Sequence, residues 1–232
     1  FIPIVEIVNF YYRYCISKIK FITLPNNVRF NYIHMGHVER KQREREKVRD
    51  NIINAAVKIA IAEGWQSVTI RKIADSIEYT PPIVYEHFEN KEDLFKELVL
   101  YGFSILHALA DKSQSKEMSP KEQLVTLSLA HWDFAFANKE LFQLMFSLER
   151  LNPNEEVMKR GFKLYHIFTE ISGKSEKEAI ALIFNWMCLV QGTISVFMHF
   201  EGTENLKYLD TDNTRELFVD FIKRFISSIS KT

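Results

Sequence analysis

The clearest chemical signal in the sequence is a positive charge at the start of a predicted helix, at Lys91. Asn90 has a side chain suited to capping a helix N-terminus, and Asp93, three residues later, is placed to reach back to that cap. The dipole and the free N–H groups of a helix start attract anions, and the Lys91 ammonium adds to that attraction. The spacing therefore predicts anion binding at Lys91.

Patterns typical of catalysis or metal binding are missing from the sequence. There is no Gly-rich phosphate loop, no nucleophile–base pair and no cluster of metal ligands, and the isolated histidines lack metal spacing. The two cysteines, Cys15 and Cys188, form neither a metal framework nor a disulfide set, which favours a cytoplasmic protein. Cys188 lies in an apolar helical stretch and is expected in the core. We expect no enzyme activity, no metal and no cofactor.

The composition predicts an all-α protein. Of 232 residues only 7 are Gly and 6 are Pro, while 47% are hydrophobic and 26% are charged. Helix breakers are scarce, and no stretch shows the alternation of a half-buried strand. We expect about nine helices, arranged as an N-terminal three-helix helix-turn-helix domain followed by a C-terminal helical bundle.

Apolar spacing and capping residues predict the helices of the first domain. They are 49–63 ending at Gly64, 70–77 capped by Thr69, and 81–88 capped by Thr80 with Pro81 at its first position. A short helix that follows a tight turn can lie in the major groove of DNA while its partner braces the backbone. This layout is typical of a DNA-reading unit.

A run of alternating charges, 39–50, precedes these helices. Such a run is usually a solvated helix face or a frayed arm. Because it comes directly before the DNA-reading unit, it also fits a basic arm that contacts phosphates or the minor groove. The sequence leaves both interpretations open.

The second half of the chain has further helix signals. Capping boxes at Ser119–Glu122 and Ser175–Glu178 open two of the helices. The predicted helices are 119–138, 139–150, 153–171, 176–200 and 213–230.

The region from Thr69 to Phe88 resembles the DNA-binding motif of the TetR family of bacterial transcriptional regulators. The match, over about 50 residues, includes in order Gly64-Trp65, Thr69-Ile70-Arg71-Lys72-Ile73-Ala74, Val84-Tyr85-Glu86-His87-Phe88 and Lys91-Glu92-Asp93-Leu94. The resemblance implies a DNA-binding domain over 35–98 and an effector-binding and dimerisation domain over 99–232. It implies a homodimer, most simply a ligand-responsive repressor, on a palindromic double-stranded DNA operator.

The resemblance also implies the residues at the DNA. They are Thr69, Arg71, Thr80, Pro82, Ile83, Tyr85, Glu86, His87 and Lys91. The hydroxyl of Thr69 and the side chains of Tyr85 and His87 would contact phosphates, which hold the register without specifying bases. The exposed face of 81–86 would read bases.

The predicted reading face departs from the family. The usual Gly-Val-Ser-Lys-Gly-Thr is replaced by Glu78-Tyr79-Thr80-Pro81-Pro82-Ile83, which loses a basic residue and two backbone N–H donors. Pro82 and Ile83 offer apolar contact to a thymine methyl, and Glu86 can accept from a cytosine amine or pair with a lysine. The two prolines, with the acidic balance of residues 35–232 (26 Lys and Arg against 29 Asp and Glu), support an alternative: a TetR-like helical adaptor with weak or lost DNA binding.

The C-terminal helices carry the other expected sites. A small apolar or amphipathic effector would bind between helices, and its candidate contacts are His131, Phe134, Met145, Phe146, Phe162, His166, Trp186 and Gln191. The last two helices have broad apolar faces that suit a four-helix dimer interface. Its candidate residues are Ile194, Phe197, Leu217, Phe218, Phe221 and Phe225.

Residues 1–34 differ in composition from the rest and are rich in Phe, Ile, Tyr, Asn and Lys. They resemble translated AT-rich non-coding DNA, and Met35 then opens a segment that reads as a natural start. The alternative is a genuine extension that packs on the body. The segment has neither the pattern of a signal peptide nor an unbroken apolar run long enough to span a membrane, and we expect no membrane partner.

Overall fold

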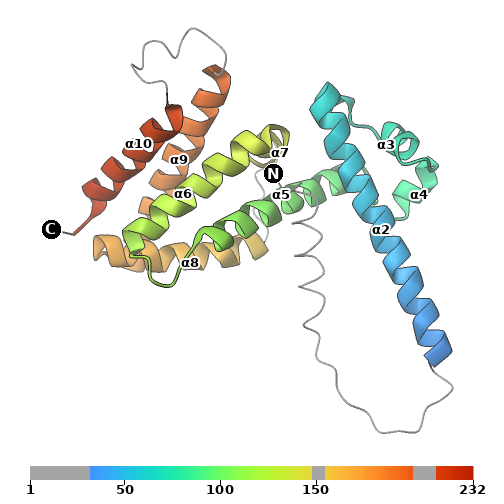
Figure 1. Ribbon diagram of the computed structural model, residues 1–232, viewed down its shortest axis with the longest axis horizontal. Coiled ribbons are helices and arrows are strands. Elements are labelled where there is room, and N and C mark those ends of the chain that lie inside the picture. Colours follow the sequence, from blue (N-terminus) through green and yellow to red (C-terminus); the bar gives the residue numbers. More distant parts are fainter. Residues whose placement is uncertain (1–31, 148–154, 201–212, 232) are drawn as a thin grey trace. The chain divides into compact units, whose positions relative to one another are not determined.

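The computed structural model describes residues 32–147, 155–200 and 213–231, with side chains from residue 39 and, in helix α8, from residue 164. Nearly all of the predicted leader 1–34 therefore lies outside the described residues. Within them the protein is all-α, as predicted, and no strand occurs (Figure 1).

The described elements comprise nine α-helices and one 3-10 turn. They are α2 (Tyr32–Glu63), η1 (Trp65–Ser67), α3 (Ile70–Ser76), α4 (Pro81–Tyr85), α5 (Lys91–Ser113), α6 (Pro120–Ala137), α7 (Lys139–Met145), α8 (Glu155–Ser172), α9 (Glu176–Phe200) and α10 (Thr214–Ile229). Most agree with the predicted spans within two residues. Helix α4 is three residues shorter than predicted, and α7 ends at Met145, five residues before its predicted end.

Helix α2 is much longer than the predicted span 49–63, because the charged run 39–50 is part of the same helix. Two side-chain contacts at four-residue spacing lie along its exposed surface. The Arg40 guanidinium lies 3.3 Å from the Glu44 carboxylate, and the Gln42 amide donates to Glu46 at 2.9 Å. Pairs at this spacing each support a helix by a few tenths of a kcal/mol. The run is therefore helical rather than frayed.

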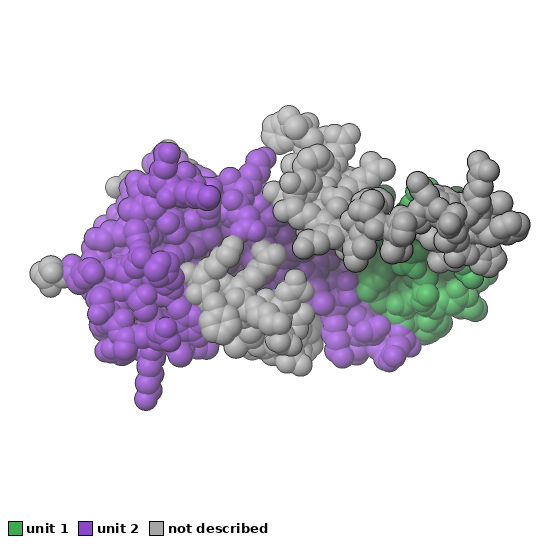
Figure 2. Space-filling model, turned by 90° about the horizontal axis from the view of Figure 1, so that it is seen from below, with its two compact units in different colours: residues 1–58, 69–88 green, residues 59–68, 89–232 purple. Residues whose placement is uncertain are grey.

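The chain forms two compact units, coloured separately in Figure 2. Unit 1 comprises residues 1–58 and 69–88, and unit 2 comprises 59–68 and 89–232. The predicted boundary at residue 98 is not where the contacts divide, because α5 belongs to unit 2. The turn after α2 also belongs to unit 2. There the Trp65 indole N–H donates to the Glu140 carbonyl at 2.8 Å.

Unit 1 encloses a small apolar core drawn from three helices. Ile52 and Ala56 on α2, Ile73 on α3 and Val84 on α4 are fully buried, and Phe88 is 2% exposed. Helices α3 and α4 pack against each other. The side chains that these short helices bury fix which of their other residues face outward.

Capping hydrogen bonds set most helix starts as predicted. Thr69 Oγ1 accepts from the Lys72 N–H at 3.2 Å, and Asn90 Oδ1 accepts from the Asp93 N–H at 2.9 Å. Ser119 and Glu122 form the predicted reciprocal capping box at the start of α6. Gly64 has φ 80° and ψ 162°, a positive-φ backbone conformation that favours glycine.

Thr80 corrects one of these predictions, because its side chain makes no capping bond. The next two residues, Pro81 and Pro82, have no N–H to donate. The first available donor, the Ile83 N–H, bonds to the Thr80 carbonyl at 3.0 Å instead. The start of α4 is therefore set by proline geometry rather than by a side-chain cap.

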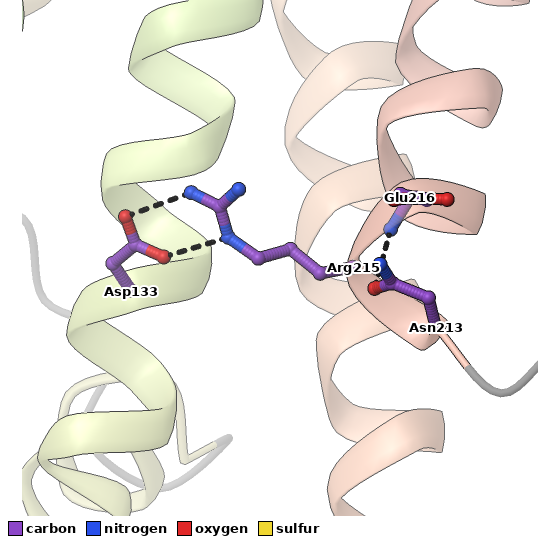
Figure 3. Close-up of polar contacts among 4 residues, drawn as sticks. All are labelled: Asp133, Asn213, Arg215 and Glu216. Carbon is purple, nitrogen blue, oxygen red and sulfur yellow. Dashed lines mark hydrogen bonds and ion pairs between the residues drawn. The ribbon is translucent and has the colours of Figure 1, made fainter.

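Unit 2 is a bundle in which α6 packs against α5, α7, α8, α9 and α10. Its core is aromatic: Trp132 lies 4.9 Å from Phe218 and 5.6 Å from Phe197, centroid to centroid. At the surface the Arg215 guanidinium makes two 3.1 Å hydrogen bonds to the Asp133 carboxylate (Figure 3). This half-exposed pair joins α10 to α6 and contributes about 0.2–1 kcal/mol.

The turn between α3 and α4 contains local strain that can be tested. Glu78 has φ 61°, and no other non-glycine residue in the described ranges has a positive φ. A left-handed residue with a Cβ costs roughly 1–2 kcal/mol, partly offset by glycine's larger entropy loss on folding. We expect Glu78→Gly to raise the free energy of unfolding by about 0.5–1 kcal/mol, measured by urea denaturation.

The control for this change is Lys58→Gly, at an exposed position within α2. It should lower the free energy of unfolding by roughly 0.7 kcal/mol, because glycine is a poor helix former. A lower stability for Glu78→Gly as well would show that the turn conformation is not strained.

Candidate nucleic-acid interface

Six of the nine residues predicted at the DNA are exposed, and two of these, Pro82 and Tyr85, lie on α4. Val84 is the fully buried residue of α4, and the Tyr85 side chain that follows it faces outward. Tyr85 is 54% exposed, which excludes a core role for its ring. The exposed members of the predicted set are Thr69, Arg71, Thr80, Pro82, Tyr85 and Glu86, and Ile83, His87 and Lys91 are half-buried.

Two arginines from α2 lie at the end of α4, and sequence reasoning did not single them out. Arg45 donates from Nη2 to the Glu86 carbonyl at 3.2 Å. The Arg49 guanidinium carbon lies 4.8 Å from the centroid of the Phe88 ring, within cation–π range. The signal that could have identified them is their four-residue spacing within the charged run, which places both side chains on one face of a helix.

The position of His87 gives it an unusual electrostatic environment. Burial lowers the pKa of its imidazole below the usual value near 6.5, and the positive charges of Arg45 and Arg49 lower it further. The Glu86 carboxylate acts in the opposite direction. The neutral form of His87 is therefore favoured in the free protein.

Lys91 begins α5, as predicted. It belongs to unit 2, whereas the sequence placed it in the DNA-binding domain 35–98. Its ammonium lies 5.2 Å from the centroid of the Phe95 ring. Glu92 and Asp93 share the first turn, and Asp93 accepts from the Glu89 N–H at 3.2 Å. Asp93 thus reaches the residue before the cap rather than Asn90 itself.

Two of the predicted effector contacts meet in the core of unit 2. The rings of His131 and Trp186 are arranged edge to face with centroids 5.3 Å apart. Ser128, which was not predicted, is fully buried. Its hydroxyl accepts a hydrogen bond from the Trp186 indole N–H at 2.8 Å and donates one to the Leu124 carbonyl at 2.8 Å. Burial lowers the pKa of His131, against the effect of its bond to the Leu127 carbonyl.

The other predicted effector contacts are dispersed. Phe134 and Met145 are fully buried, and Phe146 and Gln191 are half-buried. The imidazole of His166 is 78% exposed and lies 2.9 Å from Glu170, so it faces solvent rather than the bundle interior. The Phe162 side chain lies outside the described residues. Within those residues no group of three potential metal ligands comes together.

The residues of the last two helices that were predicted at a dimer interface are buried or half-buried in unit 2. Ile194, Phe197 and Phe218, predicted at a dimer interface, are buried in the core of unit 2. Leu217, Phe221 and Phe225 are half-buried. The reason is that α9 and α10 use these residues to pack on the rest of their own bundle.

The outer face of α9 is apolar and exposed instead. Phe184 is 62% exposed, and Ile180 and Met187, on the same side of the helix, are less so. Val196 is 50% exposed on another side of α9. Cys188 is also exposed, which corrects its predicted core position. By length and composition alone α9 could cross a membrane, but its opposite face is packed within the bundle.

Comparison with known proteins shows which families and proteins this chain is similar to. The family model described as bacterial regulatory proteins, tetR family, matches residues 52–98. A segment of 54 residues is 32% identical to the HTH-type transcriptional regulator TcmR of Streptomyces glaucescens, covering 23% of this chain and 24% of TcmR. Another of 105 residues is 24% identical to the HTH-type transcriptional repressor NicS of Pseudomonas putida, covering 45% of this chain and 50% of NicS.

Solved structures extend the likeness in fold to most of the chain. A TetR variant from Acinetobacter baumannii AYE in complex with minocycline aligns with a TM-score of 0.61 and 18% identity, over 76% of this chain and 93% of that one. The TetR regulator SCO7222 from Streptomyces coelicolor aligns with a TM-score of 0.60 and 20% identity, over 79% and 99%.

The fold and the matched segment define a helix-turn-helix protein with a helical second unit. Residues 52–98 match the tetR family of bacterial regulatory proteins, and most of the chain shares its fold with solved TetR structures. The curated relatives are named as transcriptional regulators rather than enzymes, in agreement with the sequence-based expectation. The matched segments span only about a quarter and a half of these relatives.

The buried hydrogen bond between Trp186 and Ser128 gives a test of the core of unit 2. Ser128→Ala removes the acceptor for a buried indole N–H, which costs about 1–3 kcal/mol of unfolding free energy. We expect this loss in urea denaturation. Ser227→Ala is a matched control, because Ser227 also donates to a carbonyl four residues earlier but is exposed. Equal effects of the two changes would contradict the assigned role of Ser128.

Proposed function

We propose that this protein is a DNA-binding transcriptional regulator, a repressor that acts as a homodimer on a palindromic operator. The observation that carries the proposal is the outward presentation of Tyr85 and the neighbouring α4 residues by a helix-turn-helix unit that the family match covers. One curated relative, NicS, is itself named a repressor.

The reading face supports a particular kind of base contact. Pro82 is exposed and Ile83 half-buried on α4, and neither side chain can form a hydrogen bond. Apolar groups in the major groove recognise the thymine methyl. We therefore propose that this part of the operator is read through thymine methyl groups, while hydroxyl and cationic side chains hold phosphates.

The phosphate role of Tyr85 can be tested with a minimal change. Tyr85→Phe removes one exposed hydroxyl and leaves the core untouched, so we expect roughly tenfold weaker operator binding per protomer and unchanged stability. The measurement is a mobility-shift titration of the DNA upstream of the gene at several salt concentrations. Tyr165→Phe, in unit 2, is the matched control and should bind DNA as the unaltered protein does.

The same titration distinguishes the regulator from the alternative, a helical adaptor that has lost DNA binding. A regulator should bind one sequence selectively, with an affinity that falls as salt increases. If the unaltered protein shows no selective, salt-dependent binding to any sequence in a random pool, the regulator proposal is wrong and the adaptor is favoured.

We propose that the exposed apolar face of α9, defined by Ile180, Phe184 and Met187, contacts a second copy of the chain. An apolar face of this kind on a surface helix needs a partner to exclude water. A second copy also suits the DNA, since two reading helices fit two half-sites about one helical turn apart. The half-buried residues of α10 would border this interface.

The dimer interface can be tested at Phe184, its most exposed aromatic residue. Phe184→Glu places a charge in the proposed contact, so we expect a monomer by analytical ultracentrifugation and operator binding at least tenfold weaker. Ile61→Glu, at a 61% exposed position on α2, is the control and should remain dimeric. A dimeric Phe184→Glu variant would contradict the assignment.

We also propose that a small apolar or amphipathic effector binds in the bundle of unit 2. The supporting observations are the His131–Ser128–Trp186 cluster, which combines aromatic surface with a few polar groups, and the binding of minocycline by the similar A. baumannii TetR variant. An effector with different affinities for DNA-competent and DNA-incompetent dimers would shift their populations.

A further inference from the structure

Three basic side chains converge at the end of α4 in unit 1. Arg45 and Arg49 lie one turn apart on α2 and contact successive parts of the segment that follows α4. Arg45 bonds to the Glu86 carbonyl at 3.2 Å, and Arg49 lies over the Phe88 ring at 4.8 Å. His87 stands between these two contact points in the chain and experiences both positive charges.

Both contacts have a structural use, but the contact of Arg45 leaves some of its donors available to solvent. A guanidinium has five N–H donors, and Arg45, which is exposed, is shown giving one of them to the Glu86 carbonyl. The adjacent imidazole is half-buried and the adjacent phenol, on Tyr85, is exposed. Placing two guanidiniums against an imidazole disfavours its charged form, and a bound anion would reverse that effect.

We propose that Arg45, Arg49 and His87 together bind one backbone phosphate of DNA at the end of α4. This inference rests on the proposed DNA-reading function and adds a second helix, α2, to the interface. It assigns the charged run 39–50 a role as a helical phosphate-contacting arm. Guanidinium groups suit this role because their planar donors match phosphate oxygens.

Proton uptake follows from the electrostatics of the cluster. The charged groups whose fields reach His87 are Arg45 and Arg49 from α2 and Glu86 beside it. A phosphate adds negative charge there, which raises the pKa of His87 from its lowered value in the free protein. DNA then binds the protonated form more tightly, so the affinity is highest at low pH and is lost as pH rises through the pKa of the bound state.

The phosphate contact is tested by removing the two charges of α2. The double variant Arg45→Gln/Arg49→Gln should bind the operator at least tenfold more weakly. The slope of log affinity against log salt should become shallower by about 0.9 per protomer. Arg45→Gln alone keeps a donor for the Glu86 carbonyl and should show a smaller loss in the same direction. Thermal melting checks that both variants remain folded.

Arg43→Gln is the matched control. Arg43 is exposed on the same helix, but two residues from Arg45 it points about 200° away around the helix axis. The change of net charge is the same as in Arg45→Gln, so a general electrostatic effect would weaken both equally. Equal losses, or an unchanged salt slope in the double variant, would overturn the inference.

A pH titration of operator binding tests the role of His87. As the pH rises from below the lowered pKa of free His87 to above its pKa in the bound state, the unaltered protein should lose up to tenfold in affinity per pH unit and protomer. His87→Gln should abolish this dependence, whereas His166→Gln, at a 78% exposed position in unit 2, should retain it. Absence of any DNA binding by the unaltered protein would refute the proposed function itself. Normal binding that persists in His87→Gln with the same pH dependence would refute only this inference.

Discussion

The structure of the reading unit depends on how a five-residue helix is held in place. A helix as short as α4 is not stable alone, because the conformational entropy lost on nucleating it exceeds the stabilisation from the hydrogen bonds of a single turn. Burial of Val84 and Phe88 in the core of unit 1 holds it in place. Arg45 and Arg49 of α2 also contact the residues that follow its C-terminus. The orientation of the exposed Tyr85 is a consequence of these contacts.

The turn before α4 shows how the chain tolerates a departure from its family pattern. Glu78 takes the left-handed conformation at a position where the family commonly has glycine. Pro81 and Pro82 then begin the helix without N–H donors, so the phosphate attraction of a helix start is weaker there. Two positive groups at the end of α4, Arg45 and Arg49, come from α2, which lies far from it in sequence.

Helix α9 links the fold of unit 2 to its proposed assembly. Trp186, Ile194 and Phe197 pack in the bundle, while Phe184 and Val196 face outward. A helix that is apolar all round can bury one side in its own unit and leave the other for a partner. The same element therefore carries the core, the buried hydrogen bond to Ser128 and the proposed dimer contact.

The sequence by itself determined the features that depend on neighbouring residues. Helix starts at Thr69, Asn90 and Ser119 follow from capping bonds that span three residues, and Gly64 follows from a backbone conformation that favours glycine. The ordered helix-turn-helix motif belongs to this group.

Tertiary structure decided the features that depend on residues far apart in the chain. Apolar character alone could not tell that Phe197 is core and Phe184 surface, or that Cys188 is exposed, because helical periodicity cannot assign two apolar faces.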